Sequence, residues 1–419
     1  MKALVFDKSK YDWETSHGFE LVNIPEPVLD EKNNPGDANY VIMKVHYAGI
    51  CGTDRGIWNR QAFRDVILGS IDKDDEIARS AGGEAILKQD GTASAALAVS
   101  ASKTYRIIGH EFFGEIIKVG SAVKNLKPGD FAACESHVVC NKCYQCLRGQ
   151  KEVCTNEKIL GISHDGGFAE FAKVPSHIVW KTDTSKIRPE VAAMQEPFGN
   201  AVHAASKVDV KGKSVAIFGL GPIGMFLTIV LKGMGASSII GVDPNPVTQD
   251  MAKKLGIDYV IPLYNVVQAP GLPNKQGKAL PYIHDTSLTD EIKKITNGVG
   301  VDISFEMAGF NSSVNNCLYA TRRGGEVVLF GIKQGDFVFE DFNRLIVNGF
   351  TFHAVIGRQI WQTWETTRSL MENTKNGVQE KLFNVILDRG QDTILPIEEY
   401  TKERFEEMMA KHPKFLIQF

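Results

Sequence analysis

The chain has 419 residues, more than the roughly 250 to 300 that one hydrophobic core usually holds, so we expect at least two domains. Hydrophobic residues make up 43% of it and charged residues 23%, which excludes a disordered, collagen-like or disulfide-rich chain. With 47 Lys and Arg against 50 Asp and Glu, the formal charge of −3 argues against nucleic acid or an anionic membrane as a partner and favours a small-molecule substrate.

The N-terminal apolar run at 1–6 is short and leads into polar residues, unlike a secretory signal peptide. No apolar run approaches the ~20 residues that a membrane helix needs. We therefore expect a cytoplasmic protein that makes no membrane contact.

Short β-like runs separated by Gly, Pro and Asp fill the first half of the chain, at 40–45, 114–119 and 131–133. Strands spaced in this way predict an irregular barrel or partial sandwich. Residues 59–104 interrupt the pattern, and we interpret them as an insertion. Its Ala-, Ser- and Gly-rich part from 78 to 102 predicts a loop or a surface helix.

Four of the seven cysteines crowd into one short stretch of a lobe at 134–156, with the spacing Cys140-x2-Cys143-x2-Cys146-x7-Cys154, while Cys51, Cys134 and Cys317 stand apart. In a reducing compartment such a cluster indicates metal binding rather than disulfides. Four thiolates close a tetrahedral zinc shell, so we predict a structural zinc ion. An iron–sulfur cluster is the alternative occupant; four unliganded cysteines are disfavoured because exposed thiols oxidise.

From about Lys211 the pattern changes to alternating strands and helices, which predicts a parallel sheet with right-handed crossovers. Strands are expected at 214–218, 238–243, 258–261, 301–306, 326–331 and 351–356, with an apolar helix after Pro222. Residues 268–285, rich in Pro and Gly, predict a second surface insertion.

A glycine-rich run, Gly219-Leu220-Gly221-Pro222-Ile223-Gly224, follows the first of these strands and opens the apolar helix. Gly219 permits the tight turn, Gly221 lets a pyrophosphate approach the backbone, and Gly224 lets the helix pack on the strand. Asp243 ends the next strand, where a carboxylate binds the adenosine ribose and repels a 2′-phosphate. The run therefore predicts an NAD site involving Gly219, Gly221, Pro222, Ile223, Gly224 and Asp243; a glycine-rich turn in another α/β protein is the alternative.

The C-terminal segment predicts a helix at 361–371 and ends in an apolar run at 415–417. That run is placed to rejoin the N-terminal domain as a strand. The nucleotide-binding domain would then be an insertion within the catalytic domain.

Four residues could build a second, catalytic zinc site: Cys51, His110, Glu111 and Glu196. A catalytic zinc ion needs fewer protein ligands and one exchangeable position. Taken singly each residue is weak evidence, because a lone Cys or His is usually structural and a lone Glu is usually solvated. Their joint occurrence with the cysteine lobe and the glycine-rich run is what favours a metal site.

With these motifs, the chain resembles the medium-chain, zinc-containing dehydrogenase superfamily over nearly its whole length, and most closely the L-threonine 3-dehydrogenases. The resemblance is carried by Glu196-Pro197-Phe198-Gly199-Asn200-Ala201-Val202-His203, by Gly357-Arg358 with Trp361-Gln362-Thr363-Trp364, and by Glu135-Ser136-His137-Val138-Val139-Cys140. It implies an α/β protein: a GroES-like, β-rich catalytic domain (1–196 and 358–419) and a doubly wound Rossmann domain (197–357).

The resemblance also implies roles for individual residues. Cys51, His110 and Glu196 would be the catalytic-zinc ligands, with Glu111 a nearby or exchanging carboxylate, so the choice between the two glutamates stays open. Thr53 would receive the substrate's proton. His137 matches a position that faces the substrate pocket, although a loop histidine beside the cysteine lobe is an equal alternative.

The implied reaction is zinc-dependent, NAD-linked oxidation of a secondary alcohol, with L-threonine giving 2-amino-3-ketobutyrate, by a homo-oligomer that is a tetramer or a dimer. Two departures leave the substrate open. Gly56 stands where the family commonly has a proton-relaying histidine, and the run through Arg55 also resembles sugar dehydrogenases. A polyol or aldose dehydrogenase is therefore one alternative, and a non-catalytic NAD-binding scaffold or sensor is another.

Overall fold

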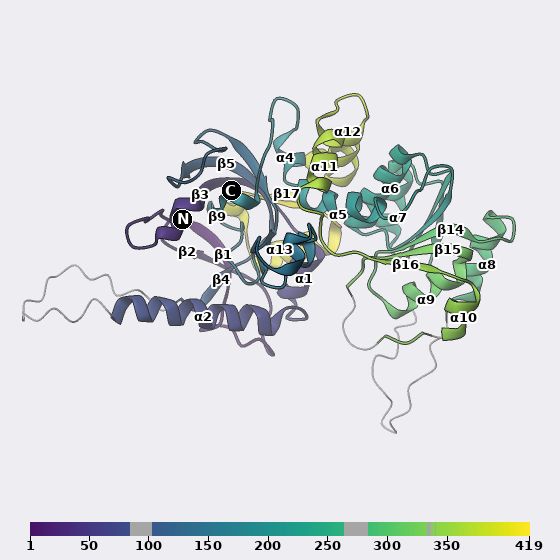
Figure 1. Ribbon diagram of the computed structural model, residues 1–419, viewed down its shortest axis with the longest axis horizontal. Coiled ribbons are helices and arrows are strands. Elements are labelled where there is room, and N and C mark those ends of the chain that lie inside the picture. The colour runs from purple at the N-terminus through teal and green to yellow at the C-terminus, as the bar shows by residue number, and fades with distance from the viewer. Residues whose placement is uncertain (84–102, 264–283, 333–336, 340) are drawn as a thin grey trace, which may run out of the picture. The chain divides into compact units, whose positions relative to one another are not determined.

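The computed structural model describes residues 1–83, 103–263, 284–332, 337–339 and 341–419, with only the backbone at 78–83. By internal packing they form two compact units: unit 1 (Met1–Glu196 and Gly390–Phe419) and unit 2 (Pro197–Arg389) (Figure 1). Residues 358–389, which we assigned to the catalytic domain, group instead with unit 2. There the Arg358 guanidinium donates to Asn200 Oδ1 at 2.8 Å, and Lys381 Nζ donates to the Leu255 carbonyl at 3.1 Å.

Unit 1 is built mainly from β-strands, as the first half of the sequence predicts. Its strands are β1 (Lys2–Asp7), β2 (Glu20–Asn23), β3 (Tyr40–Gly49), β4 (Tyr105–Ile107), β5 (Glu111–Val119), β6 (Phe131–Cys134), β7 (His137–Val138), β8 (Lys158–Ile159), β9 (Phe171–Pro175), β10 (Val179–Lys181), β17 (Ile394–Pro396) and β18 (Leu416–Gln418). Its helices are α1 (Gly52–Trp58), α2 (Arg64–Gly83), α3 (Tyr144–Leu147), α4 (Pro189–Ala192) and α13 (Lys402–Lys411).

The largest sheet of unit 1 has the order β10-β6-β5-β3-β18-β17, and β9 also pairs with β3. β3 lies inside this sheet and carries a run of buried apolar side chains, Val41, Met43 and Val45 among them. The C-terminal strand β18 pairs antiparallel with β3, with Ile417 opposite Ala48. This confirms that the end of the chain rejoins the N-terminal domain as a strand.

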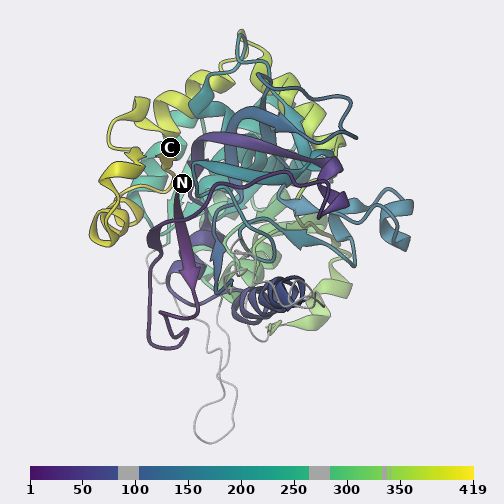
Figure 2. The same ribbon diagram turned by 90° about the vertical axis from the view of Figure 1, so that its left-hand side faces the viewer.

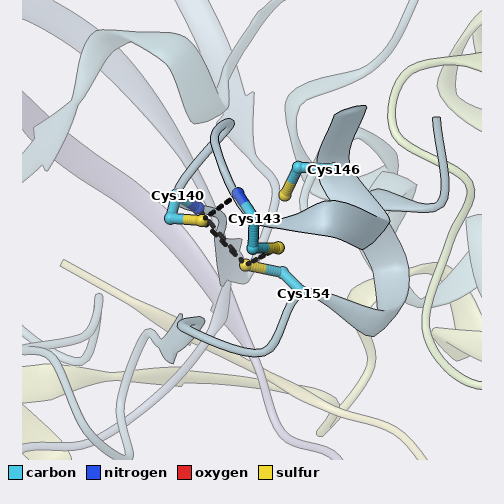
Figure 3. Close-up of side chains that lie close together, drawn as sticks. All are labelled: Cys140, Cys143, Cys146 and Cys154. Carbon is cyan, nitrogen blue, oxygen red and sulfur yellow. Dashed lines mark hydrogen bonds between the residues drawn. The ribbon is translucent and has the colours of Figure 1, made fainter. Parts of the chain in front are cut away.

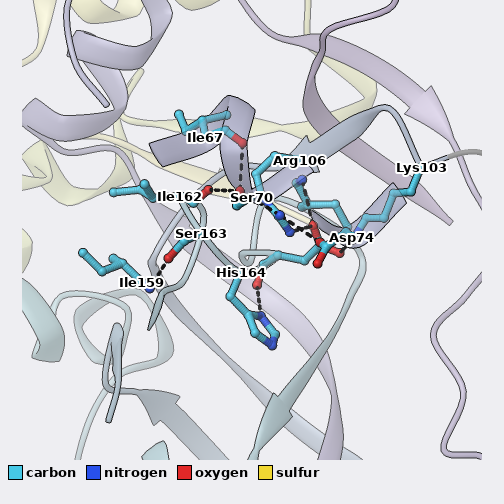
Figure 4. A network of polar contacts seen from close by, with 11 residues as sticks. Ile67, Ser70, Asp74, Lys103, Arg106, Ile159, Ile162, Ser163 and His164 are labelled. Carbon is cyan, nitrogen blue, oxygen red and sulfur yellow. Dashed lines mark hydrogen bonds and ion pairs between the residues drawn. The ribbon is translucent and has the colours of Figure 1, made fainter. Parts of the chain in front are cut away.

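Most of the described part of the first insertion is the 20-residue helix α2, which begins at Arg64. Figure 1 shows α2 beside β4, and Figure 2 shows the same helix nearly end on. A buried arginine attaches it: Arg106 of β4, 1% exposed, pairs with Asp74 of α2 at 2.8 Å and with Asp165 at 2.9 Å (Figure 4). Residues 84–102 of the insertion lie outside the described residues.

Unit 2 alternates strands and helices. Its strands are β11 (Ser214–Phe218), β12 (Ser238–Asp243), β13 (Tyr259–Pro262), β14 (Val301–Glu306), β15 (Thr321–Leu329) and β16 (Thr351–Ala354). Its helices are α5 (Gln195–Ala205, which begins just before the unit boundary), α6 (Pro222–Met234), α7 (Pro246–Leu255), α8 (Thr286–Ile295), α9 (Asn311–Ala320), α10 (Phe342–Val347), α11 (Gln362–Glu372) and α12 (Val378–Lys381).

The six strands of unit 2 form one parallel sheet in the order β13-β12-β11-β14-β15-β16. This is the doubly wound Rossmann order, with α6 and α7 packed together and α8 packed on α9. The strands and the helix expected from the sequence are all present. Most of the second insertion, 268–283, lies outside the described residues.

Among the described residues, no helix combines the length and the apolar character required to cross a bilayer.

Candidate active site and metal centres

The first candidate metal site lies just beyond the end of β3, where Cys51 is the N-cap residue of α1. The Cys51 sulfur accepts a hydrogen bond from the backbone N–H of Thr53 at 3.2 Å. In return, Asp54 Oδ2 accepts from the backbone N–H of Cys51 at 3.0 Å. These reciprocal capping contacts fix the direction of the sulfur, which lies 3.0 Å from Nε2 of His110.

His110 and Glu111 reach the site from the start of β5, which pairs with β3 so that Gly49 lies opposite Glu111. The turn before His110 needs a glycine, because Gly109 has φ +89° and a Cβ there would lie 2.0 Å from the ring of Phe168. The ligand atoms of Cys51, His110 and Glu111 all lie within 4.8 Å of one another. The structure thus brings together three residues of the proposed metal site.

The electrostatics of this group fit a metal ion. Burial raises the pKa of the Cys51 thiol. Burial also opposes charging of His110, but the charges of Cys51 and Asp54 outweigh it and hold the pKa of His110 well above its usual range. Among the described residues, buried His110 Nδ1 and Asp54 Oδ1 have no hydrogen-bond partner and face each other at 3.7 Å. A cation on the sulfur and Nε2 would favour the thiolate, with Asp54 as the outer partner of the imidazole.

The third member, Glu111, is paired with a lysine from the other end of the chain. Nζ of Lys414 contacts Glu111 Oε2 and also donates to the carbonyl of Ile50 at 3.0 Å. Gly49 makes room for the pair, since a Cβ there would lie 2.5 Å from Glu111 Oε2 and 2.9 Å from Lys414 Nζ. Burial raises the pKa of Glu111 to about 7, although the charge of Lys414 lowers it.

The other residues expected at this site lie around the cluster. Glu196, 3% exposed near the start of α5, is close enough for its charge to raise the pKa of both His110 and Glu111. It is not among the three residues whose ligand atoms lie within 4.8 Å of one another, so the geometry favours Glu111 as the nearer carboxylate. Thr53 is held beside Cys51 through its backbone N–H.

His137 lies in β7 and is 8% exposed. Its backbone N–H donates to Glu135 Oε1 at 3.0 Å, and its ring Nδ1 lies 2.6 Å from Glu157 Oε2, which fits an N–H donating to a carboxylate. Glu157 thus orients the imidazole ring, and Glu135 holds the backbone of the same residue.

The second candidate metal site is the cysteine lobe (Figure 3). The four sulfurs of Cys140, Cys143, Cys146 and Cys154 lie within 4.8 Å of one another, with separations such as 3.5 Å and 3.8 Å. These values are close to the ~3.8 Å expected across a tetrahedral zinc–thiolate shell and far from a bonded S–S distance of ~2.05 Å. Hydrogen bonds, chiefly from the backbone N–H of Cys146, lower the pKa of Cys143 to about 5. The residues fit a closed, structural zinc ion.

In unit 2, the glycine-rich run joins β11 to α6. Gly219 has φ +102°, and a Cβ on Gly224 would lie 2.1 Å from the Gly219 carbonyl oxygen, so this turn needs glycine at both positions. Gly221 is the N-cap of α6, Pro222 takes its first position and Ile223 follows. Asp243 Oδ2 accepts from the backbone N–H of Leu220 at 2.7 Å, which places the carboxylate beside the loop.

The sequence reasoning missed three side chains that support these sites: Asp54, Lys414 and Glu157. Asp54 could have been found, since an acidic residue three positions after an N-cap is a capping-box pattern. The other two act on residues far away in the chain, and no local pattern indicates them.

The chain combines a Rossmann sheet with two groups of possible metal ligands. One is an open group of a thiolate, an imidazole and a carboxylate, and the other is a closed group of four thiolates. This combination defines the class of zinc-dependent alcohol dehydrogenases. Comparison with known proteins agrees. The family description "Alcohol dehydrogenase GroES-like domain" matches residues 37–184, and "Zinc-binding dehydrogenase" matches residues 222–373.

Among curated relatives, the L-threonine 3-dehydrogenase of Pyrococcus abyssi is 36% identical over 363 residues, covering 86% of each chain. That of Bacillus licheniformis is 31% identical over 373 residues, covering 89% of this chain and 88% of its own. The chain therefore belongs to the zinc-binding alcohol dehydrogenase family, within the group that includes the L-threonine 3-dehydrogenases. It is a zinc-dependent, NAD(P)-linked enzyme that acts on an alcohol.

Solved structures agree in fold. The alcohol dehydrogenase TADH from Thermus sp. ATN1 has a TM-score of 0.72 at 21% identity, and the 2R,3R-butanediol dehydrogenase from Bacillus subtilis has a TM-score of 0.71 at 21% identity. Each comparison covers 100% of this chain and 99% of the other. At this level of identity the likeness concerns the fold alone.

Proposed function

We propose that the protein oxidises the secondary alcohol of L-threonine with NAD, giving 2-amino-3-ketobutyrate, NADH and a proton. The observation that carries the proposal is the convergence of Cys51, His110 and Glu111 within 4.8 Å, from segments far apart in the sequence. The choice of substrate is supported by the relatives named L-threonine 3-dehydrogenase, at 31–36% identity.

In this proposal, Cys51, His110 and one glutamate hold the catalytic zinc ion. Glu111 is the nearer candidate for that glutamate, and Glu196 is the second candidate. When bound, zinc acidifies the substrate hydroxyl and the nicotinamide accepts a hydride. Thr53, fixed beside Cys51, accepts the hydroxyl proton. Because Gly56 has no side chain to continue the relay, we expect water to carry that proton onward.

An absorbance assay for the reduced nicotinamide tests this function, using L-threonine, sorbitol and glucose as substrates. We expect L-threonine to be oxidised and Cys51→Ser to abolish turnover. Cys134→Ser is a matched control, because Cys134 is also a buried thiol of unit 1 but lies in the apolar core, with its sulfur 3.5 Å from Met43 Sδ. If the enzyme oxidises a polyol but not L-threonine, the assignment of the substrate is wrong. If the Cys51→Ser variant is active, the assignment of the metal site is wrong.

The second candidate is a polyol or aldose dehydrogenase. It is supported by Arg55 after the Cys-Gly-Thr-Asp run and by fold neighbours named galactitol-1-phosphate dehydrogenase and L-idonate 5-dehydrogenase, at 20% and 22% identity. In this structure, however, the Arg55 guanidinium donates to backbone carbonyls, including that of His412 at 2.6 Å. It is therefore occupied by a structural role, and we prefer L-threonine.

We also propose a homo-oligomer, formed at the outer strand β16 of the unit 2 sheet. β16 has a neighbour on one side only within the described residues, and apolar side chains near it are exposed: Phe342 by 60%, Ile346 by 70% and Phe352 by 37%. An open edge with exposed apolar side chains favours pairing with a second copy. Light scattering after size exclusion should give a dimer or tetramer that Ile346→Asp weakens; a monomeric wild type would contradict the proposal.

A further inference from the structure

We propose that Glu157 determines substrate specificity: its carboxylate, oriented by His137, binds the ammonium group of the substrate. This rests on the proposed function, because it assigns the part of the site that would recognise an amino acid rather than a neutral polyol. Nothing in the metal chemistry requires an acidic residue here, so the pair needs its own explanation.

The pair is well defined. His137 Nδ1 lies 2.6 Å from Glu157 Oε2, and the side chains are 10% and 25% exposed. The backbone of the histidine is held as well, since its N–H donates to Glu135 Oε1 at 3.0 Å. Only one carboxylate oxygen of Glu157 is used by the ring, so the other can accept a hydrogen bond from a ligand.

The backbone brings this pair to the metal-binding segment. β7 and β8 pair antiparallel, with His137 opposite Ile159. Two residues after Ile159, Gly161 approaches Gly109 so closely that a Cβ on it would lie 2.6 Å from the Gly109 nitrogen. Gly109 directly precedes His110. The chain that leaves β8 therefore packs against the segment that presents the metal-binding imidazole.

The charges of the pair match an amino acid. L-Threonine carries an ammonium and a carboxylate next to its secondary alcohol, whereas a polyol carries neither. A partly desolvated carboxylate attracts an ammonium more strongly than a fully solvated one does. Glu157 is thus a specificity-determining residue, and His137 is its positioning residue.

The test uses the zinc-loaded, full-length enzyme and the variant Glu157→Gln, which keeps the shape and removes the charge. KM and kcat are measured for L-threonine. Competitive inhibition constants are measured for 1-amino-2-propanol, which keeps the ammonium, and for 3-hydroxybutyrate, which lacks it. Glu20→Gln is the matched control, because Glu20 is a glutamate of unit 1 with the same 25% side-chain exposure, paired with Lys10 at 2.7 Å.

In Glu157→Gln we expect the KM for L-threonine and the inhibition constant of 1-amino-2-propanol to rise about tenfold or more. We expect kcat and the inhibition constant of 3-hydroxybutyrate to stay within about twofold, and Glu20→Gln to match the wild type. Equal changes for both inhibitors, a fall in kcat alone, or an unchanged KM would overturn the role of Glu157 while leaving threonine oxidation intact. A wild type that does not oxidise L-threonine would overturn the proposed function and this inference together.

Discussion

Lys414 and Glu111 form an ion pair inside unit 1, with side chains 0% and 2% exposed, although they are 303 residues apart in the sequence. The pair forms because β18, which begins two residues after Lys414, pairs with the end of β3 beside the start of β5. Glu111 is a candidate zinc ligand, so the C-terminal segment directly supports the metal site.

Replacing Lys414 by Met should destabilise the protein strongly. The variant leaves the Glu111 carboxylate buried without its cation, a loss worth about 3–5 kcal/mol. Thermal unfolding measures the effect. Lys411→Met is the control: Lys411 is 55% exposed and pairs with Asp392 at the surface, so its loss should cost at most about 1 kcal/mol. Equal melting temperatures for the two variants would contradict the role of the buried pair.

Replacing Cys143 by Ser should remove the structural zinc ion and leave the other one. We expect elemental analysis to give about two zinc ions per chain in the wild type and about one in the variant. Cys317→Ser should keep both ions, since Cys317 is a buried, free thiol of unit 2. Full zinc content in Cys143→Ser would show that the four sulfurs do not share an ion.

Replacing Asp243 by Asn should weaken the preference for NAD over NADP. The carboxylate at the end of β12 is expected to accept from the adenosine ribose and to repel a 2′-phosphate. We therefore expect the ratio of kcat/KM for NAD to that for NADP to fall about tenfold. Asp250→Asn, a change at an exposed carboxylate of α7, should leave the ratio unaltered. A wild type that prefers NADP would contradict the assignment.

His203 should make unit 2 less stable in mild acid. Burial lowers its pKa to about 4; the residue is 1% exposed, and its Nδ1 donates to the Gly357 carbonyl at 2.9 Å. The unfolded chain, with a histidine pKa of about 6.5, binds more protons between those two values. Protonation of His203 therefore does not affect the free energy of unfolding above about pH 6.5. Below it, the free energy of unfolding falls, by about 2–3 kcal/mol as the pH approaches about 4.

Thermal unfolding of wild type and His203→Gln at about pH 7.5 and about pH 5 checks this prediction. The variant should lose less stability than the wild type on acidification. His17→Gln, a change at a histidine whose side chain is 61% exposed, should keep the wild-type response. An identical loss in His203→Gln would show that another group causes the pH dependence.

The sequence predicted those features in which the constraint is local. The turn from Gly219 to Gly224 is recognisable because the glycines, the strand before them and the helix after them are contiguous. The cysteine lobe is recognisable for the same reason, since all four thiols fall between Cys140 and Cys154.

The contacts that the sequence did not indicate depend on the pairing register between strands that are far apart in the chain. It predicted that the C-terminal run becomes a strand, but only the pairing of Ile417 with Ala48 places Lys414 on Glu111. Likewise, Glu157 reaches His137 because β7 pairs with β8. Residues 358–389 were assigned by family likeness to the catalytic domain, whereas the contacts of Arg358 and Lys381 hold them in unit 2.

The most direct test of the central claim is a crystal structure with diffraction measured on both sides of the zinc absorption edge. We predict two anomalous peaks per chain, one among the four cysteine sulfurs and one bounded by Cys51 Sγ, His110 Nε2 and a glutamate carboxylate. A single peak in the cysteine lobe, with Cys51 and His110 free of metal in the zinc-supplemented protein, would contradict the account.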